Sequence, residues 1–253
     1  MNGSAAIQTS SLLIASSLVL VTLFFSYWQK LKLEKETLIS VIRAVIQLIA
    51  VGYVLNYVFG VKNPLFTTFL LLFMTFNAAY NAAKRGRTIR HGLEISFFSI
   101  LIGALVTLTV LLLSKTIHYE PYQMIPIGGM IISNAMVALG LCYKQMTADF
   151  KTKREEVETK LALGADIRAS SIDIIRDSIK TGMLPTIDSA KTLGIVSLPG
   201  MMTGLILAGA SPLEAIKYQL MVTFMLLSTT AIASFIACSL AYRAFFNTRM
   251  QVK

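Results

Sequence analysis

Charge is scarce in this sequence. Asp, Glu, Lys and Arg together make up 14% of the 253 residues, and hydrophobic residues make up 55%; the mean hydropathy is +0.67. A soluble domain has about 25% charged residues and needs polar faces on its helices. Several uncharged stretches here are long enough to cross a bilayer. The composition excludes a soluble globular domain and predicts an all-α, polytopic membrane helical bundle.

Cysteines and nucleotide-binding motifs are also nearly absent. The two cysteines, Cys142 and Cys238, have no CxxC or Cys/His spacing, which argues against a zinc site and a disulfide framework. No GxxxxGK[ST] phosphate loop occurs, so the polypeptide is not expected to bind ATP in that way. A Ser/His pair, an HExxH motif and a pair of membrane-buried Asp are missing too. We therefore do not expect an enzyme.

Seven apolar stretches follow one another along the chain, and we expect each to be a membrane span within a single permease domain, residues 1–253. They are Ala5–Tyr27, Leu38–Phe59, Leu65–Ala83, Leu93–Leu113, Tyr122–Leu141, Thr192–Ala210 and Pro212–Tyr242.

Basic residues outnumber acidic ones by 23 to 13, for a net charge of +10. If the N-terminus lies outside, nearly all Lys and Arg fall in segments on the cytoplasmic side, as the positive-inside rule requires. This distribution predicts an outside N-terminus and a cytoplasmic C-terminus. It also argues against nucleic-acid binding, since the excess charge is explained by membrane topology.

The stretch Thr192–Gln219 interrupts its own apolar run. Pro199-Gly200 sits inside the sixth predicted span, where a proline removes a helix hydrogen bond. Gly200, Gly204 and Ala208 recur every four residues and form a small-residue face for helix packing. Ser211, followed by Pro212, has the pattern of a helix N-cap. We expect a broken membrane helix, a tight external turn and a further membrane helix.

Residues 142–191 form the one long hydrophilic segment, which we expect to be a cytoplasmic coupling segment of two helices. Ala148–Leu163 is highly charged, and Ile167–Ile179 alternates Ile with Arg and Asp in an amphipathic pattern. One interpretation is a pair of helices lying on the lipid headgroups, or extensions of the fifth and sixth spans. The other is a docking element that presents the apolar residues 161–165 to a cytoplasmic partner.

Two motifs carry a family resemblance. Glu158-Thr-Lys-Leu-Ala-Leu-Gly164-Ala165, followed by Met183-Leu184-Pro185, resembles the coupling-helix motif of ABC-transporter permeases, although Thr-Lys replaces the usual Ala-Ala. VSLPGMMTGLILAGASPLEAIKYQ resembles the FetB family (UPF0014) of ABC permeases. That family is implicated in bacterial iron export and is related to the plant STAR and aluminium-sensitivity permeases.

The resemblance implies a multi-pass permease subunit in the bacterial inner membrane that exports iron or another metal. It implies a homodimer energised by a separate cytoplasmic ABC ATPase subunit. ATP and Mg would be used by that partner, and this chain would bind no cofactor. The residues that match the coupling motif, and would contact the ATPase, are Glu158, Leu161, Leu163 and Gly164.

Polar residues inside the predicted spans suggest a translocation path, because such residues are costly in lipid and tend to face a bundle interior. They fall at a similar depth in the cytoplasmic half, by 1.5 Å per residue. The alternative is hydrogen bonding between helices without a substrate. The candidate path residues are Arg43, Gln47, Asn77, Asn81, Asn134, Pro199, Gly200, Met201 and Met202.

Methionines near the break could supply soft thioether ligands to a transition metal. Met201 and Met202 are the candidate ligands, although methionine in apolar helices more often fills space in the packing. Asp188, just before the sixth predicted span, is expected near a cytoplasmic entrance.

A stand-alone secondary transporter or channel is the main alternative function. Ion-coupled carriers commonly place an Asp or Glu within the membrane, and the predicted spans have none away from their edges, which argues against proton coupling. A membrane scaffold is a third possibility, supported by the small-residue face of Gly200, Gly204 and Ala208.

Overall fold

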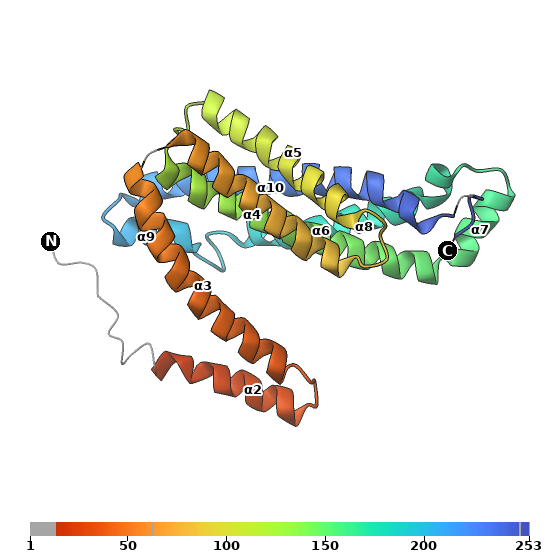
Figure 1. Ribbon diagram of the computed structural model, residues 1–253, viewed down its shortest axis with the longest axis horizontal. Coiled ribbons are helices and arrows are strands. Elements are labelled where there is room, and N and C mark those ends of the chain that lie inside the picture. Colours follow the sequence, from red (N-terminus) through yellow and green to blue (C-terminus); the bar gives the residue numbers. More distant parts are fainter. Residues whose placement is uncertain (1–13, 62, 248, 253) are drawn as a thin grey trace. The chain divides into compact units, whose positions relative to one another are not determined.

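A computed structural model describes residues 14–61, 63–247 and 249–252, which are helical over most of their length (Figure 1). The chain divides into two compact units. Unit 1 is Met1–Lys62 with Leu207–Gly209, and unit 2 is Asn63–Ile206 with Ala210–Lys253. Each unit is considered by itself below.

Unit 1 contains α2 (Leu18–Trp28) and α3 (Glu34–Val61). Ser26 connects them: its Oγ donates a hydrogen bond to Glu34 Oε1 at 2.8 Å and accepts one from the Leu33 N–H at 3.2 Å. Most of the described apolar side chains of α3 are exposed within the unit, as expected of a helix that faces lipid.

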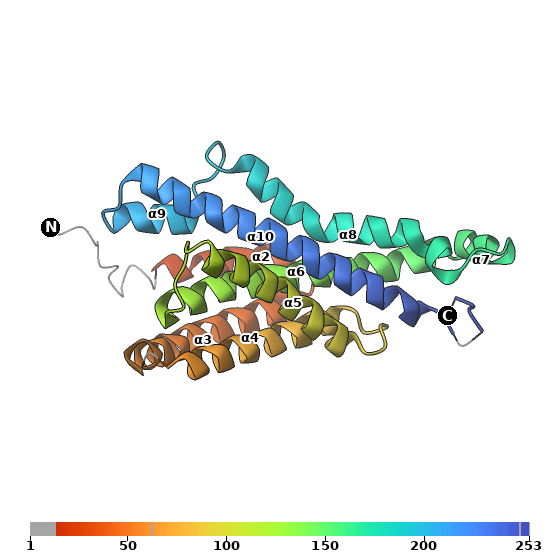
Figure 2. The same ribbon diagram turned by 90° about the horizontal axis from the view of Figure 1, so that it is seen from above.

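Unit 2 is a bundle of longer helices around α6. Its elements are α4 (Pro64–Arg85), α5 (Gly92–Leu113), α6 (Pro121–Thr152), α7 (Arg154–Ala162), α8 (Ile167–Thr192), α9 (Gly200–Leu207), α10 (Pro212–Ala241) and the 3₁₀ turn η1 (Tyr242–Phe245). Helix α6 contacts α4, α5, α8 and α10. Figure 2 shows α10 between α5 and α8, both of which it contacts.

The helices begin where local chemistry favours it. Asn63 Oδ1 accepts a hydrogen bond from the Leu65 N–H at 2.9 Å, with Pro64 at the first helical position of α4. Ser211 caps α10 in the same way, accepting from the Glu214 N–H at 3.3 Å. The start of α10 that Ser211-Pro212 predicts is thus confirmed.

Small residues let the long helices approach one another closely. At Gly103 a Cβ would lie 3.2 Å from the Thr229 carbonyl oxygen, so α5 and α10 nearly touch backbone to backbone. Thr107 and Thr229 then share a buried hydrogen bond of 2.8 Å across this contact. Close approach of this kind is the usual basis of helix association in membranes.

Five described helices are long and apolar enough to cross a bilayer: α3, α4, α5, α6 and α10. This confirms a polytopic helical membrane protein, and the five helices begin close to the starts of five predicted spans, although α6 ends at Thr152 instead of the predicted Leu141. The first predicted span, Ala5–Tyr27, begins in residues outside the described part, and the apolar helix described there is Ile14–Trp28. The number seven and the orientation of the termini stay predictions.

The sixth predicted span is where the expected arrangement differs most. Thr192–Ala210 is broken before Gly200, as Pro199 predicts, but the break is longer than expected: residues 193–199 are non-helical, and α9 has only eight residues. Upstream, α8 extends thirteen residues beyond the predicted Ile179, to Thr192. It packs against α6 and α10 along the bundle. The open interpretation of residues 142–191 as extensions of the neighbouring spans describes this part best.

Candidate functional site

A cavity of about 350 Å³ lies inside unit 2, between α6, α8, α9 and α10. Polar side chains line it from three helices and from the 193–199 connection: Asn134, Thr186, Ser189, Ser197, Gln219 and Thr223. The two thioethers of Met130 and Met201 also face it. Its wall therefore offers neutral oxygen and sulfur atoms to a solute.

The cavity exists because the α8–α9 segment is interrupted. Thr192 ends α8, with its Oγ1 donating to the Asp188 and Ser189 carbonyls, both at 3.1 Å. Gly194 then adopts a positive φ of 78°, which glycine accepts without strain. After Pro199, α9 starts again, and Thr203 Oγ1 donates to the Pro199 carbonyl at 2.6 Å. The non-helical connection leaves a gap that a continuous helix would fill.

Gln219 is the most informative polar group in this wall. Its Oε1 is buried and has no hydrogen-bond partner in the described part of the chain. A buried acceptor without a partner costs about 1–3 kcal/mol. Because Gln219 lines the cavity, a water molecule or a solute bound there would supply the missing hydrogen bond. Asn134 lies on the same cavity and uses its Nδ2 to donate to the Met130 carbonyl at 2.9 Å.

The structure brings together four of the predicted path residues. Asn134, Pro199, Gly200 and Met201 line this one cavity. Met202 instead lines an adjacent cavity, also of about 350 Å³, which shares Pro199 and Gln219 with the first. The two methionines proposed as a ligand pair thus face different cavities. Met130, on α6, is the thioether that shares a cavity with Met201.

The remaining predicted path residues lie elsewhere. Asn77 and Asn81 are exposed on α4 and donate to carbonyls of their own helix, those of Phe73 at 3.0 Å and of Asn77 at 2.8 Å. Their spacing reflects local hydrogen bonding. Arg43 and Gln47 share a face of α3 in unit 1, where they border a shallow pocket with isoleucines. Within the described residues, no group of three or more His, Cys, Asp or Glu could hold a metal ion.

Sequence reasoning missed Gln219, Thr223, Thr186 and Ser189. Gln219 and Thr223 are spaced i, i+4 on α10, the same signal that drew attention to Asn77 and Asn81. Thr186 and Ser189 were assigned to the hydrophilic cytoplasmic segment, so their position beside a membrane span could not be anticipated.

The predicted packing face is exposed. A Cβ at Gly200 or Gly204 would meet no described atom within 4 Å, and Ala208 is exposed. A partner helix for this face stays a prediction.

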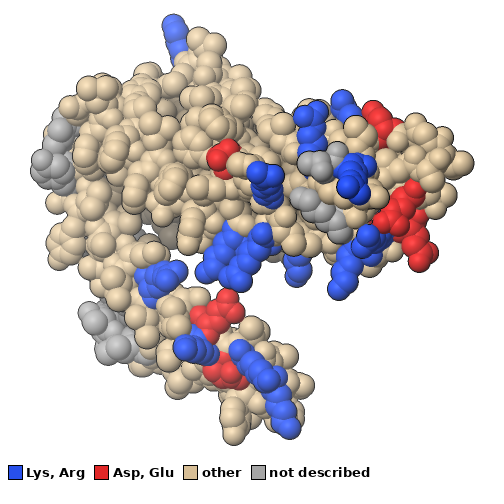
Figure 3. Space-filling view, turned by 45° about the vertical axis from the view of Figure 1, so that its right-hand side comes forward, with Lys and Arg blue, Asp and Glu red and all other residues tan. Residues whose placement is uncertain are grey.

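At the other end of unit 2, α7 carries the predicted coupling residues. Leu163 follows the helix with 83% of its surface exposed. Gly164 (φ +91°) donates its N–H to the Leu161 carbonyl at 3.0 Å and turns the chain toward α8. Glu158 is exposed and accepts a hydrogen bond from Arg154 Nε at 2.8 Å. Charged side chains gather at this end of the unit (Figure 3).

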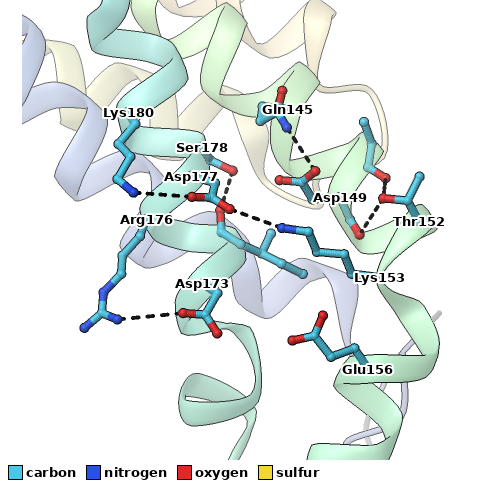
Figure 4. A network of polar contacts seen from close by, with 12 residues as sticks. Gln145, Asp149, Thr152, Lys153, Glu156, Asp173, Arg176, Asp177, Ser178 and Lys180 are labelled. Carbon is cyan, nitrogen blue, oxygen red and sulfur yellow. Dashed lines mark hydrogen bonds and ion pairs between the residues drawn. The ribbon is translucent and has the colours of Figure 1, made fainter.

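Ion pairs join α7 and the end of α6 to α8. Lys153 Nζ lies 3.1 Å from Asp177 Oδ2 (Figure 4). Lys160 Nζ bridges Glu156 at 2.7 Å and Asp173 at 3.1 Å. The hydrogen bond from Lys153 lowers the pKa of Asp177, and the same bond raises the pKa of Lys153. The network joins α7 to α8 on either side of the turn that carries Leu163.

Comparison with known proteins places this architecture. The uncharacterised protein family UPF0014 matches residues 9–246. This chain belongs to the UPF0014 family. It is 52% identical to "Probable iron export permease protein FetB" of Escherichia coli (strain K12), over 97% of this chain and 95% of that protein.

Two more distant relatives cover nearly the same range. "Protein ALUMINUM SENSITIVE 3" of Arabidopsis thaliana is 38% identical, over 93% of this chain and 86% of the relative. "UPF0014 membrane protein YjkA" of Bacillus subtilis (strain 168) is 36% identical, over 96% and 97%. No solved structure matches this chain. The family and the five apolar helices confirm a multi-pass membrane protein.

Proposed function

We propose that this UPF0014 chain is the membrane subunit of an ABC-type exporter whose cargo is iron or another metal ion. A separate cytoplasmic ATPase would bind ATP and Mg, and two copies of the permease would form the pathway. The observation that carries the proposal is 52% identity, over almost the full length of both chains, to a protein named for iron export. The bacterial inner membrane is the matching location.

The cavity supports transport of a small polar solute. Its volume of about 350 Å³ admits a metal ion with part of its water shell. Amide and hydroxyl oxygens can replace water around a hard cation, and the thioethers of Met130 and Met201 suit a softer one. The wall includes the non-helical connection between α8 and α9, and many transporters have such a helix break at their substrate sites.

The α7 tip supports the partnership with an ATPase. Leu163 is a large apolar side chain exposed outside the bundle. The ion pairs of Lys153 and Lys160 join the two helices on either side of it. An exposed leucine at the end of a short rigid helix suits insertion into a groove on another protein.

Leu163→Arg tests this contact. The chain carrying L163R should insert in the membrane normally and lose co-purification with its ATPase partner. Leu31→Arg is the matched control, because Leu31 is also exposed and lies in a predicted cytoplasmic loop. An L163R complex that keeps its ATP turnover would contradict the docking role. Cellular iron and manganese, measured with and without the exporter, would identify the cargo.

A stand-alone, ion-coupled carrier is the second candidate. The observation that favours it is Asp188, a carboxylate on the part of α8 that packs beside the apolar helices. Asp188 lies outside the predicted spans, so the search for acidic residues within those spans did not consider it. Proteoliposomes that contain this chain alone decide between the two: metal flux driven by a proton gradient without ATPase supports the carrier, and flux only with ATPase and ATP supports the exporter.

A further inference from the structure

The second half of α8 carries an ion pair at the depth of the membrane spans. Gly182 packs against Ala138 and Cys142 of α6, where the apolar part of α6 ends. From Gly182, a rise of 1.5 Å per residue puts Asp188 about 9 Å and Lys191 about 14 Å further along α8. Their neighbour Ser189 lines the same cavity as Met130 and Asn134, well inside α6. Asp188 is thus far from the entrance where we expected it.

This ion pair points away from the cavity. Lys191 Nζ lies 3.0 Å from Asp188 Oδ1, and the two side chains are 66% and 61% exposed in the described structure. Leu184, one turn before Asp188, is 47% exposed. We call Leu184, Asp188 and Lys191 the outer face of α8. The inner face of α8, which includes Pro185 and Ser189, lines the cavity.

Hydrocarbon lipid cannot be the natural neighbour of the outer face. Ionised side chains within a membrane face other protein or water and pair with one another. The pair on α8 also has the charge pattern of a self-complementary surface, because one acid and one base lie a single helical turn apart. A two-fold axis along the membrane normal places equal residues at equal depth, so that Asp188 of each copy lies one turn from Lys191 of the other.

We propose that the outer face of α8 is the contact between two copies of this chain, closed by reciprocal Asp188–Lys191 ion pairs. The proposal rests on the homodimeric permease suggested above and identifies its interface. Helix α8 then separates the cavity from the dimer contact. Movement of one copy against the other would act on Thr186 and Ser189 directly.

Charge substitutions in two differently tagged copies test the reciprocal pairs. D188K leaves two lysines on the outer face, and K191D leaves two aspartates. Each variant alone should lose its homodimer through repulsion between like charges. Co-expressed, the two should form mixed dimers, at least tenfold enriched over either homodimer. Equal recovery of mixed and like pairs would overturn the proposal, as expected if α3 of the same chain covers this face.

A cross-link gives a second measurement that does not depend on the charged variants folding. Leu184→Cys in the otherwise natural chain should form a disulfide-linked dimer in native membranes under mild oxidation. Leu105→Cys is the matched control, because Leu105 is 54% exposed on the mid-part of α5. Cys142 and Cys238 are buried and should not react. Dimers with L105C but not with L184C would overturn the proposal.

Failure of the interface and failure of the proposed function give different results. If L184C does not cross-link but the ATPase still co-purifies and metal export continues, the α8 contact is wrong and the exporter stands. If L184C cross-links and no ATPase co-purifies, the contact stands and the ABC assignment is wrong.

Discussion

Two kinds of helix in the bundle of unit 2 differ in composition and continuity: the continuous helices α4, α5, α6 and α10, and the interrupted segment α8–α9. The continuous helices are mostly apolar, and several of their contacts rest on small residues, as at Gly103 beside Thr229. Helix α8 carries Thr186, Asp188, Ser189 and Lys191 alongside them, and it ends in the non-helical connection. The continuous helices pack closely against one another, and the interrupted segment leaves a polar cavity that α6 and α10 also line. The break, rather than the helix packing, provides the space for a solute.

The contact between α6 and α8 at Gly182 should be the position where a substitution lowers stability most. A Cβ at Gly182 would clash with the Cys142 thiol and lie 2.8 Å from the Ala138 carbonyl oxygen. Gly182→Ala therefore has to push α8 off α6, and overpacking of this kind costs about 1–3 kcal/mol. A thiol-reactive dye that labels buried Cys142 and Cys238 on unfolding gives the melting temperature.

Gly204→Ala is the control, since a Cβ there meets no described atom within 4 Å and the change improves helix propensity. A G182A protein that melts with the wild type would mean that α8 does not pack on α6 as described.

Gln219→Leu should separate transport from stability. The substitution removes a buried oxygen without a partner in the described chain, so the melting temperature should stay equal or rise. Export should fall roughly tenfold, equivalent to about 1.4 kcal/mol in the barrier, because the cavity loses an amide ligand. Metal efflux from loaded vesicles measures it. Asn77→Leu, at an exposed side chain of α4 in the same unit that does not line this cavity, should leave export unchanged. Equal export in Q219L would remove the cavity from the pathway.

The continuous helices could be predicted from hydropathy because lipid and the core both accept their apolar faces. The second half of α8, after the predicted helix Ile167–Ile179, could not, because its polar residues are typical of a soluble segment. In the bundle, Thr186 and Ser189 face a cavity and Asp188 pairs with Lys191. The break at Pro199 was predictable from proline chemistry, but its length was not. Residues 193–199 are held by the turn at Gly194 and a pairing between Leu193 and Ser197.

Single polar residues within spans were the least predictable part of the site. Asn81 and Gln219 look alike in sequence, since each is an amide within a predicted span or at its start and has a polar residue four positions away. The Asn81 side-chain amide donates a hydrogen bond to the Asn77 carbonyl, whereas Gln219 lines a cavity. Only the positions of neighbouring helices distinguish these outcomes, since a helix presents both residues with the same periodicity.

Within the continuous frame, Tyr143→Phe should give a moderate loss. Tyr143 is fully buried, and its hydroxyl shares a 3.0 Å hydrogen bond with Ser96 Oγ, which also donates to the Gly92 carbonyl at 2.6 Å. Loss of one such bond costs about 1 kcal/mol, or about 2–4 °C in melting temperature for a chain of this size. Tyr53→Phe, on an exposed side chain, is the control and should melt with the wild type.

The smallest effect is expected at the α7 end of unit 2, where the end of α6 and α8 are joined by Lys153 and Asp177. Both side chains are partly exposed, so Asp177→Asn should cost less than about 1 kcal/mol at neutral pH. Because Lys153 lowers the pKa of Asp177 in the folded chain, the unfolded chain binds the proton more readily. The contribution of this carboxylate is therefore present above its ordinary pKa, near 3.8, and is lost as the pH falls through the lowered folded value. Wild type and D177N should melt apart at pH 7 and converge as the pH falls below the lowered pKa of Asp177. A constant difference across that range would mean that the Lys153 ion pair does not stabilise the folded chain.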